Sequence, residues 1–350
     1  MNEAIEIFVP TIVAFFVGIG ITPIISHYLY KWQLWKKSSV SKTIDGREAT
    51  ISNKLHNDEA RKTPRMGGII VWASVLITIY GFYLLSLFFP YNFSKLSFLS
   101  RNQTWLPLFT LISASLVGLI DDFFVTRDRG TFIGGGLSLS KRLLVVFCIG
   151  IVGGLWFYFK LGMTSIHIPF DPTMLNLGYL FIPFFVLTML AMYSGGIIDG
   201  VDGLAGGVFA IIFSALSIIA YSHNQIDLAS FSLVVTGGLL VFLWFNIPPA
   251  RFFLSETGTM GLTTTATVIA FLTGEVLLLP IIALPLLLTT LSVIIQLTSK
   301  KFRNGKKVFL VAPLHNHFIA KGWTREKVTM RYWVFSLICA VIGIVFALVS

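Results

Sequence analysis

The sequence predicts an all-α integral membrane protein, and three observations support this prediction. Hydrophobic residues make up 55% of the 350 residues and charged residues only 12%, whereas charged residues are about 25% of a typical soluble domain. The mean hydropathy is +0.82. Apolar stretches recur along the chain at close to the ~20 residues that a membrane helix needs. We therefore expect one polytopic membrane domain over residues 1–350.

About ten predicted transmembrane helices follow one another along the chain. The first starts after Glu3 and Glu6 without a basic segment or a small-residue cleavage site, so we expect a retained helix rather than a signal peptide. Pro248 and Pro249 end the seventh span, because proline lacks the amide proton that continues a helix. The predicted spans are 7–30, 67–89, 104–125, 142–160, 175–195, 203–221, 228–246, 259–275, 277–298 and 332–349.

The basic residues predict which loops face the cytoplasm. Of the 26 Lys and Arg, all but Lys95, Arg101 and Lys160 lie in the loops 31–66, 127–142, 196–202, 247–258 and 299–331. The positive-inside rule places these loops in the cytoplasm and both termini outside. Topology and attraction to anionic lipid account for the net charge of +10, so we expect no nucleic-acid partner.

The side predicted to face away from the cytoplasm carries few candidate functional residues. Residues 165–172 alternate weakly and predict a short hairpin or strand. We expect His167 in this segment to be incidental. Glu275, between the eighth and ninth spans, is expected to face water.

Asp121 and Asp122 stand at the end of an apolar run. A charged residue at the centre of a membrane helix costs about 2.5–3.5 kcal/mol, so an adjacent pair indicates a wet helix end or a bound cation. Consecutive helical residues point about 100° apart, so the two carboxylates should meet different partners. We expect one to meet a metal or phosphate and the other to take a second role.

Three further clusters lie on the same predicted face. Asp199 and Asp202, spaced i,i+3 in a Gly-rich segment, suit a nucleotide or a hydrated Mg²⁺, or else a tight turn with small-residue packing. Residues 245–258 carry Phe252, Phe253 and Glu256, and an acid near a helix start is favourable in its own right. Residues 312–318 carry two histidines. Together the clusters favour Mg²⁺-assisted phosphoryl chemistry.

The motifs in this order resemble the phospho-N-acetylmuramoyl-pentapeptide transferase family, which belongs to the polyprenyl-phosphate sugar-1-phosphate transferases. The resemblance covers essentially the whole chain, including the arrangement of spans. The motifs are Thr63-Pro64-Arg65-Met66-Gly67-Gly68, Gly118-Leu119-Ile120-Asp121-Asp122, Gly136-Leu137-Ser138, Asp199-Gly200-Val201-Asp202-Gly203-Leu204-Ala205, Phe245-Asn246 to Gly258, and Pro313-Leu314-His315-Asn316-His317-Phe318 with Lys321-Gly322-Trp323.

The resemblance implies a reaction and a location. Undecaprenyl phosphate would attack the β-phosphate of UDP-MurNAc-pentapeptide, giving lipid I and UMP with Mg²⁺ as cofactor, at the cytoplasmic face of the bacterial plasma (inner) membrane. It implies catalytic roles for Asp121, Asp122 and His315, with Asp121 as base or nucleophile. The implied metal ligands are Glu256, Asp121 and Asp199, and the implied substrate-binding residues are Asp199, Gly200, Val201, Asp202, Phe253, Gln296, Thr63 and His317.

Four positions depart from the family pattern, and all four touch the implied site. Glu256 replaces an Asp that is a Mg²⁺ ligand, which keeps the charge and adds a methylene. Gly196 replaces an Asn, so one side-chain hydrogen bond is missing. Asn316 replaces the middle His of a triple, and Arg65 replaces a Thr.

Several alternatives remain open on the sequence. The chain could be a sister transferase that uses UDP-GlcNAc or a related sugar, although the Pro-Leu-His-x-His-Phe form favours the muramoyl branch. It could instead be a catalytically impaired nucleotide-binding membrane protein. Direct attack and a covalent intermediate at Asp121 are both compatible with the residues. The oligomeric state is also open, a homodimer included.

Overall fold

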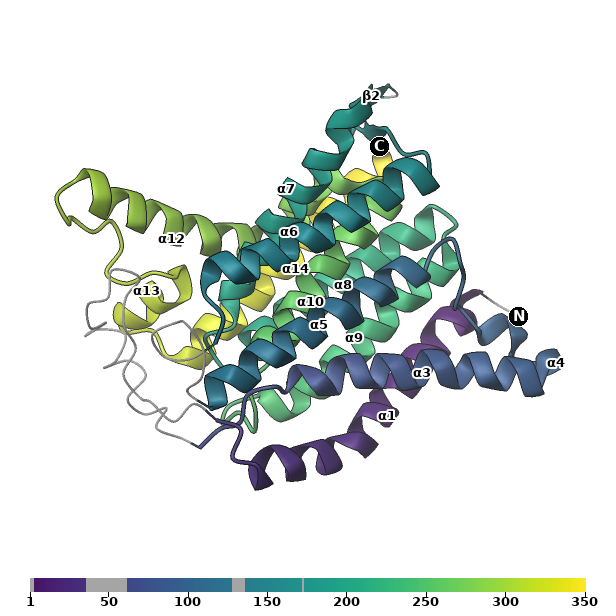
Figure 1. Ribbon diagram of the computed structural model, residues 1–350, viewed down its shortest axis with the longest axis horizontal. Coiled ribbons are helices and arrows are strands. Elements are labelled where there is room, and N and C mark those ends of the chain that lie inside the picture. Colours follow the sequence, from purple (N-terminus) through teal and green to yellow (C-terminus); the bar gives the residue numbers. More distant parts are fainter. Residues whose placement is uncertain (1–2, 36–61, 128–135, 172) are drawn as a thin grey trace.

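The computed structural model describes residues 3–35, 62–127, 136–171 and 173–350. Most of the predicted loop 31–66 and the middle of the loop 127–142 lie outside these ranges. The described chain forms a helical bundle with one small hairpin (Figure 1). The helices are α1 (Glu3–Lys31), α3 (Gly68–Phe88), α4 (Pro90–Phe93), α5 (Trp105–Thr126), α6 (Leu139–Leu155), α7 (Phe181–Ser194), α8 (Leu204–Ser222), α9 (Ile226–Asn246), α10 (Ser255–Leu272), α11 (Leu279–Ile282), α12 (Leu284–Phe302), α13 (Leu314–Ala320) and α14 (Arg325–Val349). Single helical turns are Ser94–Leu96, Trp156–Lys160, Gly178–Leu180, η5 (Gly195–Ile198) and η6 (Val276–Leu278).

The membrane architecture agrees with the predicted polytopic bundle. Among the described residues, eight helices are long and apolar enough to cross a membrane, and a pair bent by 76° adds a ninth. This pair, Val276–Ile282 with Leu284–Phe302, replaces the continuous span predicted at 277–298. Pro280 and Pro285 stand in the first turns of α11 and α12, where a residue without an amide proton is tolerated but the preceding helix cannot continue through it.

Helix α10 corresponds to the remaining predicted span and forms part of the core of the bundle. Its threonines make it less apolar than the other spans, yet all its residues except Glu256 and Leu272 are buried. Small residues let neighbouring backbones approach its first turn. A Cβ atom added at Gly118 of α5 would lie 2.1 Å from the Glu256 carbonyl oxygen, and one added at Gly68 of α3 would lie 2.4 Å from the Gly258 nitrogen. This contact of α3, α5 and α10 fixes the backbone under the candidate site.

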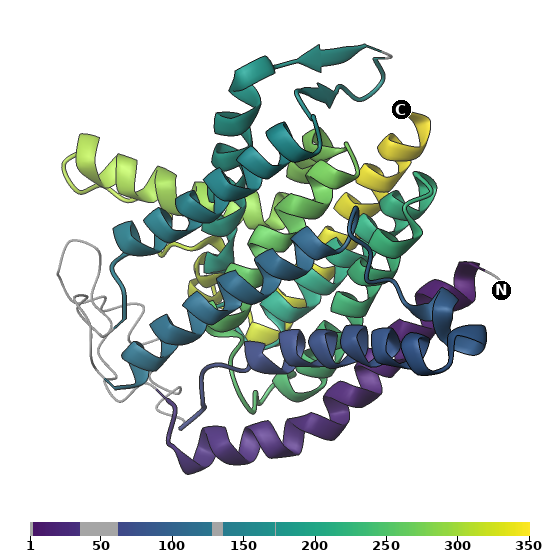
Figure 2. The same ribbon diagram turned by 45° about the vertical axis from the view of Figure 1, so that its right-hand side comes forward.

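The two ends of the bundle differ in what they carry. Helices α12 and α13 lie at one end, which we call the site end, and both chain termini lie toward the opposite, far end (Figures 1 and 2). The predicted hairpin is confirmed at the far end, where strand β1 (Ser165–His167) pairs antiparallel with β2 (Met174–Asn176).

Glu275 at the far end is buried, so the expectation that it faces water is wrong. Its carboxylate is 4% exposed, and its Oε1 atom lies 3.3 Å from Nδ1 of His167 and 3.5 Å from Nε2 of His223. The hairpin and the turn between α8 and α9 each bring one imidazole to this carboxylate. His167 is therefore a contact residue rather than an incidental one.

Candidate active site

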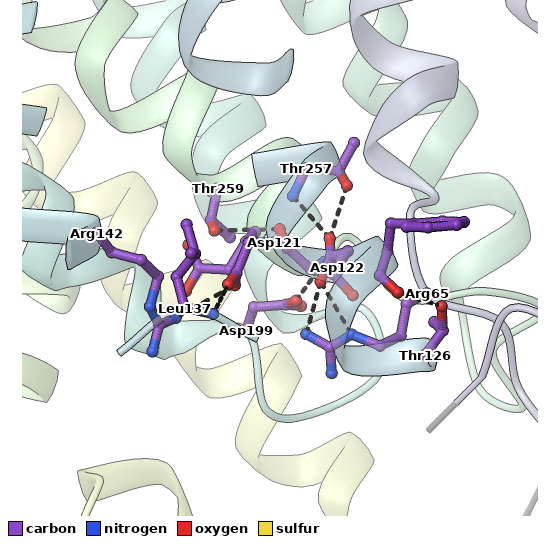
Figure 3. A network of polar contacts seen from close by, with 12 residues as sticks. Arg65, Asp121, Asp122, Thr126, Leu137, Arg142, Asp199, Thr257 and Thr259 are labelled. Atoms are coloured by element: carbon purple, nitrogen blue, oxygen red, sulfur yellow. Dashed lines mark hydrogen bonds and ion pairs between the residues drawn. The ribbon is translucent and has the colours of Figure 1, made fainter. Parts of the chain in front are cut away.

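Asp122 joins two separate segments to the end of α5. Its side chain is fully buried, and its Oδ1 accepts hydrogen bonds from Nε of Arg65 at 3.0 Å and pairs with Nη2 at 2.9 Å. Its Oδ2 accepts from the amide of Thr257 at 2.9 Å and from the Thr257 hydroxyl at 2.6 Å. Asp122 therefore ties the segment before α3 to the first turn of α10 (Figure 3).

Asp121 faces a different set of partners, as the spacing of consecutive helical residues predicts. Its Oδ1 accepts a hydrogen bond from the Leu137 amide. Gly136, with φ of +84°, packs so closely that a Cβ atom there would lie 2.9 Å from this oxygen. Oδ2 lies 3.9 Å from Nη1 of Arg142. Arg142 and Arg65 thus flank the two aspartates from opposite sides (Figure 3).

Asp199 and Asp202 lie on a turn rather than on one helix face. Asp199 follows η5 with ψ of 75°, and Gly203, with φ of +75°, is the N-cap directly before α8. Asp199 Oδ2 accepts from the Ser255 amide at 2.7 Å, and Asp202 Oδ2 accepts from the Ala250 amide at 3.0 Å. Both acids therefore hold the 247–258 loop. Burial raises the pKa of Asp199 to about 6.

The first turn of α10 is capped by carboxylates from other helices. The first amide groups of a helix have no partner within the helix and carry its positive dipole end. Here Asp199 accepts from the amide of Ser255, and Asp122 accepts from the amide of Thr257. The charges of the buried Asp122 and the half-buried Asp199 are thereby partly balanced by backbone amides.

Glu256, between these two amides, makes an ion pair that the sequence analysis missed. Its Oε1 pairs with Nη1 of Arg142, and its Oε2 accepts from the Tyr193 hydroxyl at 3.3 Å. In the sequence, Arg142 is one of the basic loop residues that indicate topology. A basic residue directly at the start of an apolar run, four residues after the Gly-Leu-Ser motif, is the signal that could have singled it out.

The predicted metal ligands are only partly brought together. Among the described residues, no group of three His, Cys, Asp or Glu side chains is placed to hold a metal ion. Asp121 and Glu256 both approach Arg142 Nη1, whereas Asp199 is engaged with Ser255. Mg²⁺ needs only one or two carboxylates when phosphate oxygens and water complete its shell. The donor chemistry of Asp121 and Glu256 therefore fits Mg²⁺, and the predicted ligand role of Asp199 stays a prediction.

Asn246 and the two phenylalanines order the loop beside the Asp199 turn. Asn246 accepts from the Gly203 amide and donates to the Phe252 carbonyl, both at 2.8 Å. Phe252 is fully buried, while Phe253 is only half-buried. The Phe253 backbone pairs with Pro64 and Gly67, at 2.9 and 2.8 Å. Thr63, directly before this pairing, is buried.

The α13 histidines reach the site unequally. His315 is buried against Gly200, where an added Cβ atom would lie 2.7 Å from its Nε2. His317 accepts through Nδ1 from the Leu310 amide at 3.2 Å. The side-chain oxygen of Gln296 accepts hydrogen bonds from the backbone amides of Val308 and Phe309, both at 3.0 Å, in the loop before α13. In this state Gln296 positions a loop, and its predicted substrate contact stays a prediction.

The other predicted positions also lie in this region. Val201 is buried in the Asp199 turn. At Gly196, where the family has Asn, an added Cβ would lie 3.3 Å from Thr259. Asn316 is buried beside His315.

An apolar groove of about 590 Å³ adjoins the site between α1, α3 and α5. Met66 and the α5 residues Leu119, Ile120 and Phe123 line it, together with Arg127. It offers space for a hydrocarbon chain beside the carboxylates.

Comparisons with known proteins identify the family of this chain. The model of glycosyl transferase family 4 matches residues 104–274. A phospho-N-acetylmuramoyl-pentapeptide-transferase of Geobacillus sp. (strain WCH70) is 36% identical over 81% of this chain and 83% of its own. The enzymes of that name from Bacillus subtilis (strain 168) and Anoxybacillus flavithermus are 33% and 32% identical, over 81% and 98% of this chain and 83% and 98% of their own. The chain belongs to the phospho-N-acetylmuramoyl-pentapeptide-transferase family.

Proposed function

We propose that this protein transfers phospho-MurNAc-pentapeptide from UDP-MurNAc-pentapeptide to undecaprenyl phosphate in the bacterial plasma membrane, as a step of peptidoglycan synthesis. The products are lipid I and UMP. The observation that carries the proposal is the meeting of four sequence-distant motifs around the first turn of α10, in a chain of this family.

The reaction exchanges one phosphorus–oxygen bond for another. An oxygen of the lipid phosphate bonds to the β-phosphorus of the donor, and the bond to the UMP oxygen breaks. A phosphate monoester has a second pKa of about 6, so a general base is needed for only part of the acceptor at neutral pH. Asp121 is our candidate, because its Oδ2 faces the Arg142 side chain rather than a backbone amide. Direct attack and a covalent phosphosugar on Asp121 both fit, and trapping of an adduct would exclude direct attack.

We also propose that the reaction needs Mg²⁺. Asp121 and Glu256 would hold it together with donor phosphate oxygens and water. When bound, the ion would shield the negative charge of the diphosphate.

The nucleotide would lie over the Asp199 turn. Asp199, Gly200, Val201 and Asp202 would offer backbone and carboxylate contacts to uracil, and the half-buried ring of Phe253 would stack on it. His315 closes this region from α13. These assignments rest on the family resemblance together with the shared location.

The experiment is UMP release by the purified protein with Mg²⁺, undecaprenyl phosphate and UDP-MurNAc-pentapeptide. UDP-GlcNAc is offered in a parallel reaction, and Asp121→Asn is the inactive control. We expect release with the muramoyl donor only. Release above the control with UDP-GlcNAc alone would assign the sister activity, and release with neither donor would refute the proposal.

A further inference from the structure

Arg142 occupies the place between two carboxylates where a cation would lie. Its Nη1 pairs with Oε1 of Glu256 and stands 3.9 Å from Oδ2 of Asp121. Its side chain is 20% exposed. The carboxylates come from α10 and α5, and Arg142 comes from α6. Three helices thus meet at one guanidinium group.

The hydrogen-bond donors of Arg142 are not all used in this position. A guanidinium offers five donors in a fixed fork and has no other protonation state in a protein. The Nε atom of Arg142 is buried and has no hydrogen-bond partner among the described residues. It therefore leaves a donor unused in this position, which a phosphate oxygen could take.

Two cations cannot share this place without strong repulsion. A Mg²⁺ ion binds carboxylate oxygens at about 2.0–2.1 Å, which requires the oxygens that now face Arg142. The extra methylene of Glu256, relative to the family's Asp, lengthens the arm that reaches Arg142. A divalent ion can bind both carboxylates only if the guanidinium moves away.

We propose that Arg142 is an exchangeable counter-ion. Without metal it balances Asp121 and Glu256, and a divalent cation displaces it toward the donor diphosphate, where its unused donors bind phosphate. The identity of the physiological ion and of the donor rests on the proposed function. The exchange itself is a property of these three side chains and is testable without substrate.

The first test measures Mn²⁺ binding to the purified full chain by electron paramagnetic resonance, with no nucleotide or lipid phosphate added. Arg142→Gln should bind Mn²⁺ at least about tenfold more tightly than the unmodified protein, since the competing charge of a partly buried ion pair is gone. Lys141→Gln is the matched control: it removes the same charge from the adjacent, exposed position. It should leave Mn²⁺ affinity within about twofold, as screened surface charges do.

Arg142→Lys is a second variant in case Arg142→Gln does not fold. It keeps the positive charge but loses the planar fork of the guanidinium. It should bind Mn²⁺ several-fold more tightly than the unmodified protein, by weakening the pair with Glu256. Size-exclusion profiles and thermal unfolding report whether each variant is folded. Unchanged or weaker Mn²⁺ binding in a folded Arg142→Gln, or in Arg142→Lys if the first variant does not fold, overturns the proposal.

A kinetic test examines whether the displaced guanidinium of Arg142 binds the donor diphosphate. In Arg142→Gln we expect half-maximal UMP release at a lower Mg²⁺ concentration together with a higher KM for the donor. A donor KM equal to that of the unmodified protein contradicts the phosphate contact. If the unmodified protein releases UMP but the Arg142 variants bind Mn²⁺ as the unmodified protein does, only the counter-ion inference fails. If Mn²⁺ affinity responds as expected but no UMP is released, only the proposed function fails.

Discussion

Asp121 and Asp122 are adjacent in the chain but serve different parts of the molecule. Asp122 accepts hydrogen bonds or ion-pair contacts on both oxygens from Arg65 and Thr257. Asp121 accepts one backbone hydrogen bond and turns its other oxygen toward Arg142. We therefore expect stability to depend on Asp122 and turnover on Asp121.

The Asp122→Asn substitution should lower the free energy of unfolding by about 3 kcal/mol. It removes the buried charge that balances Arg65 and turns one acceptor oxygen into a donor facing the Thr257 amide. Thermal unfolding of the purified protein in detergent measures the effect. The Asp121→Asn variant is the matched comparison, with a smaller loss of stability and UMP release reduced by at least about 100-fold. Equal loss of stability in the two variants would contradict this division of roles.

For single residues, the sequence predicts the direction in which a side chain points better than it predicts which groups that side chain contacts. The angle between consecutive helical residues is enough to predict that the two carboxylates diverge. Asp122 and Thr257 are 135 positions apart in the chain, so their contact depends on how α5 packs on α10. The resemblance likewise singles out Glu256, but the Arg142 and Tyr193 contacts arise from two further helices.

Among the elements, the contact between α5 and α10 has no room for a side chain. Gly118→Ala would place a methyl group 2.1 Å from the Glu256 carbonyl oxygen. We expect α10 to shift and the free energy of unfolding to fall by about 1–3 kcal/mol. Gly81→Ala on α3 is the control, because no heavy atom lies within 4 Å of the added Cβ. Thermal unfolding of both variants compares them, and equal midpoints would show that the contact is looser than described.

At the far end, Glu275 should be coupled energetically to the two histidines that contact it. We expect a double-mutant cycle of Glu275→Gln and His223→Ala to give a coupling of about 0.5–3 kcal/mol in unfolding free energy. The cycle of Glu275→Gln with Lys160→Ala serves as a reference, because Lys160 is exposed. A coupling with His223 no larger than the reference value would mean that the 3.5 Å approach contributes nothing.

The elements that the sequence describes least well are those whose hydropathy does not report their tertiary surroundings. Proline positions alone mark the break between α11 and α12, yet the apolar residues continue through it, so a single span is the natural prediction. Glu275 reads as a wet loop residue because hydropathy does not report that β1 folds over it. Tertiary cover, rather than local propensity, decides both cases.

For the whole molecule, the predicted orientation has a direct test. Cys148 and Cys339 are replaced by Ala, and single cysteines are introduced at Met174 of the hairpin or Lys306 beyond α12, both exposed. In intact cells a membrane-impermeant maleimide should label the Met174→Cys variant, and should label Lys306→Cys only after permeabilisation. The opposite pattern would reverse the orientation assigned from the basic loops.

The order of the apolar helices and the gathering of acidic clusters at one end follow from hydropathy and charge, because the bilayer imposes both on the sequence. The interior position of α10 does not follow from these, because its threonines lower its hydropathy, and the sequence does not show that Thr263, Thr264 and Thr267 donate their hydroxyls to carbonyls of the same helix. Its burial becomes visible only when the surrounding helices are in place.

The capping of α10 has a consequence for how the site receives an anion. A helix start with open amides is a common phosphate receptor. In this protein the amides of Ser255 and Thr257 are already bound by Asp199 and Asp122, so the receptor is closed by the chain's own acids. An incoming diphosphate therefore meets a predominantly negative floor and must bring or recruit positive charge in order to stay. Such a floor disfavours phosphorylated compounds that arrive without a cation, so the chain's own acids favour donors whose charge is neutralised.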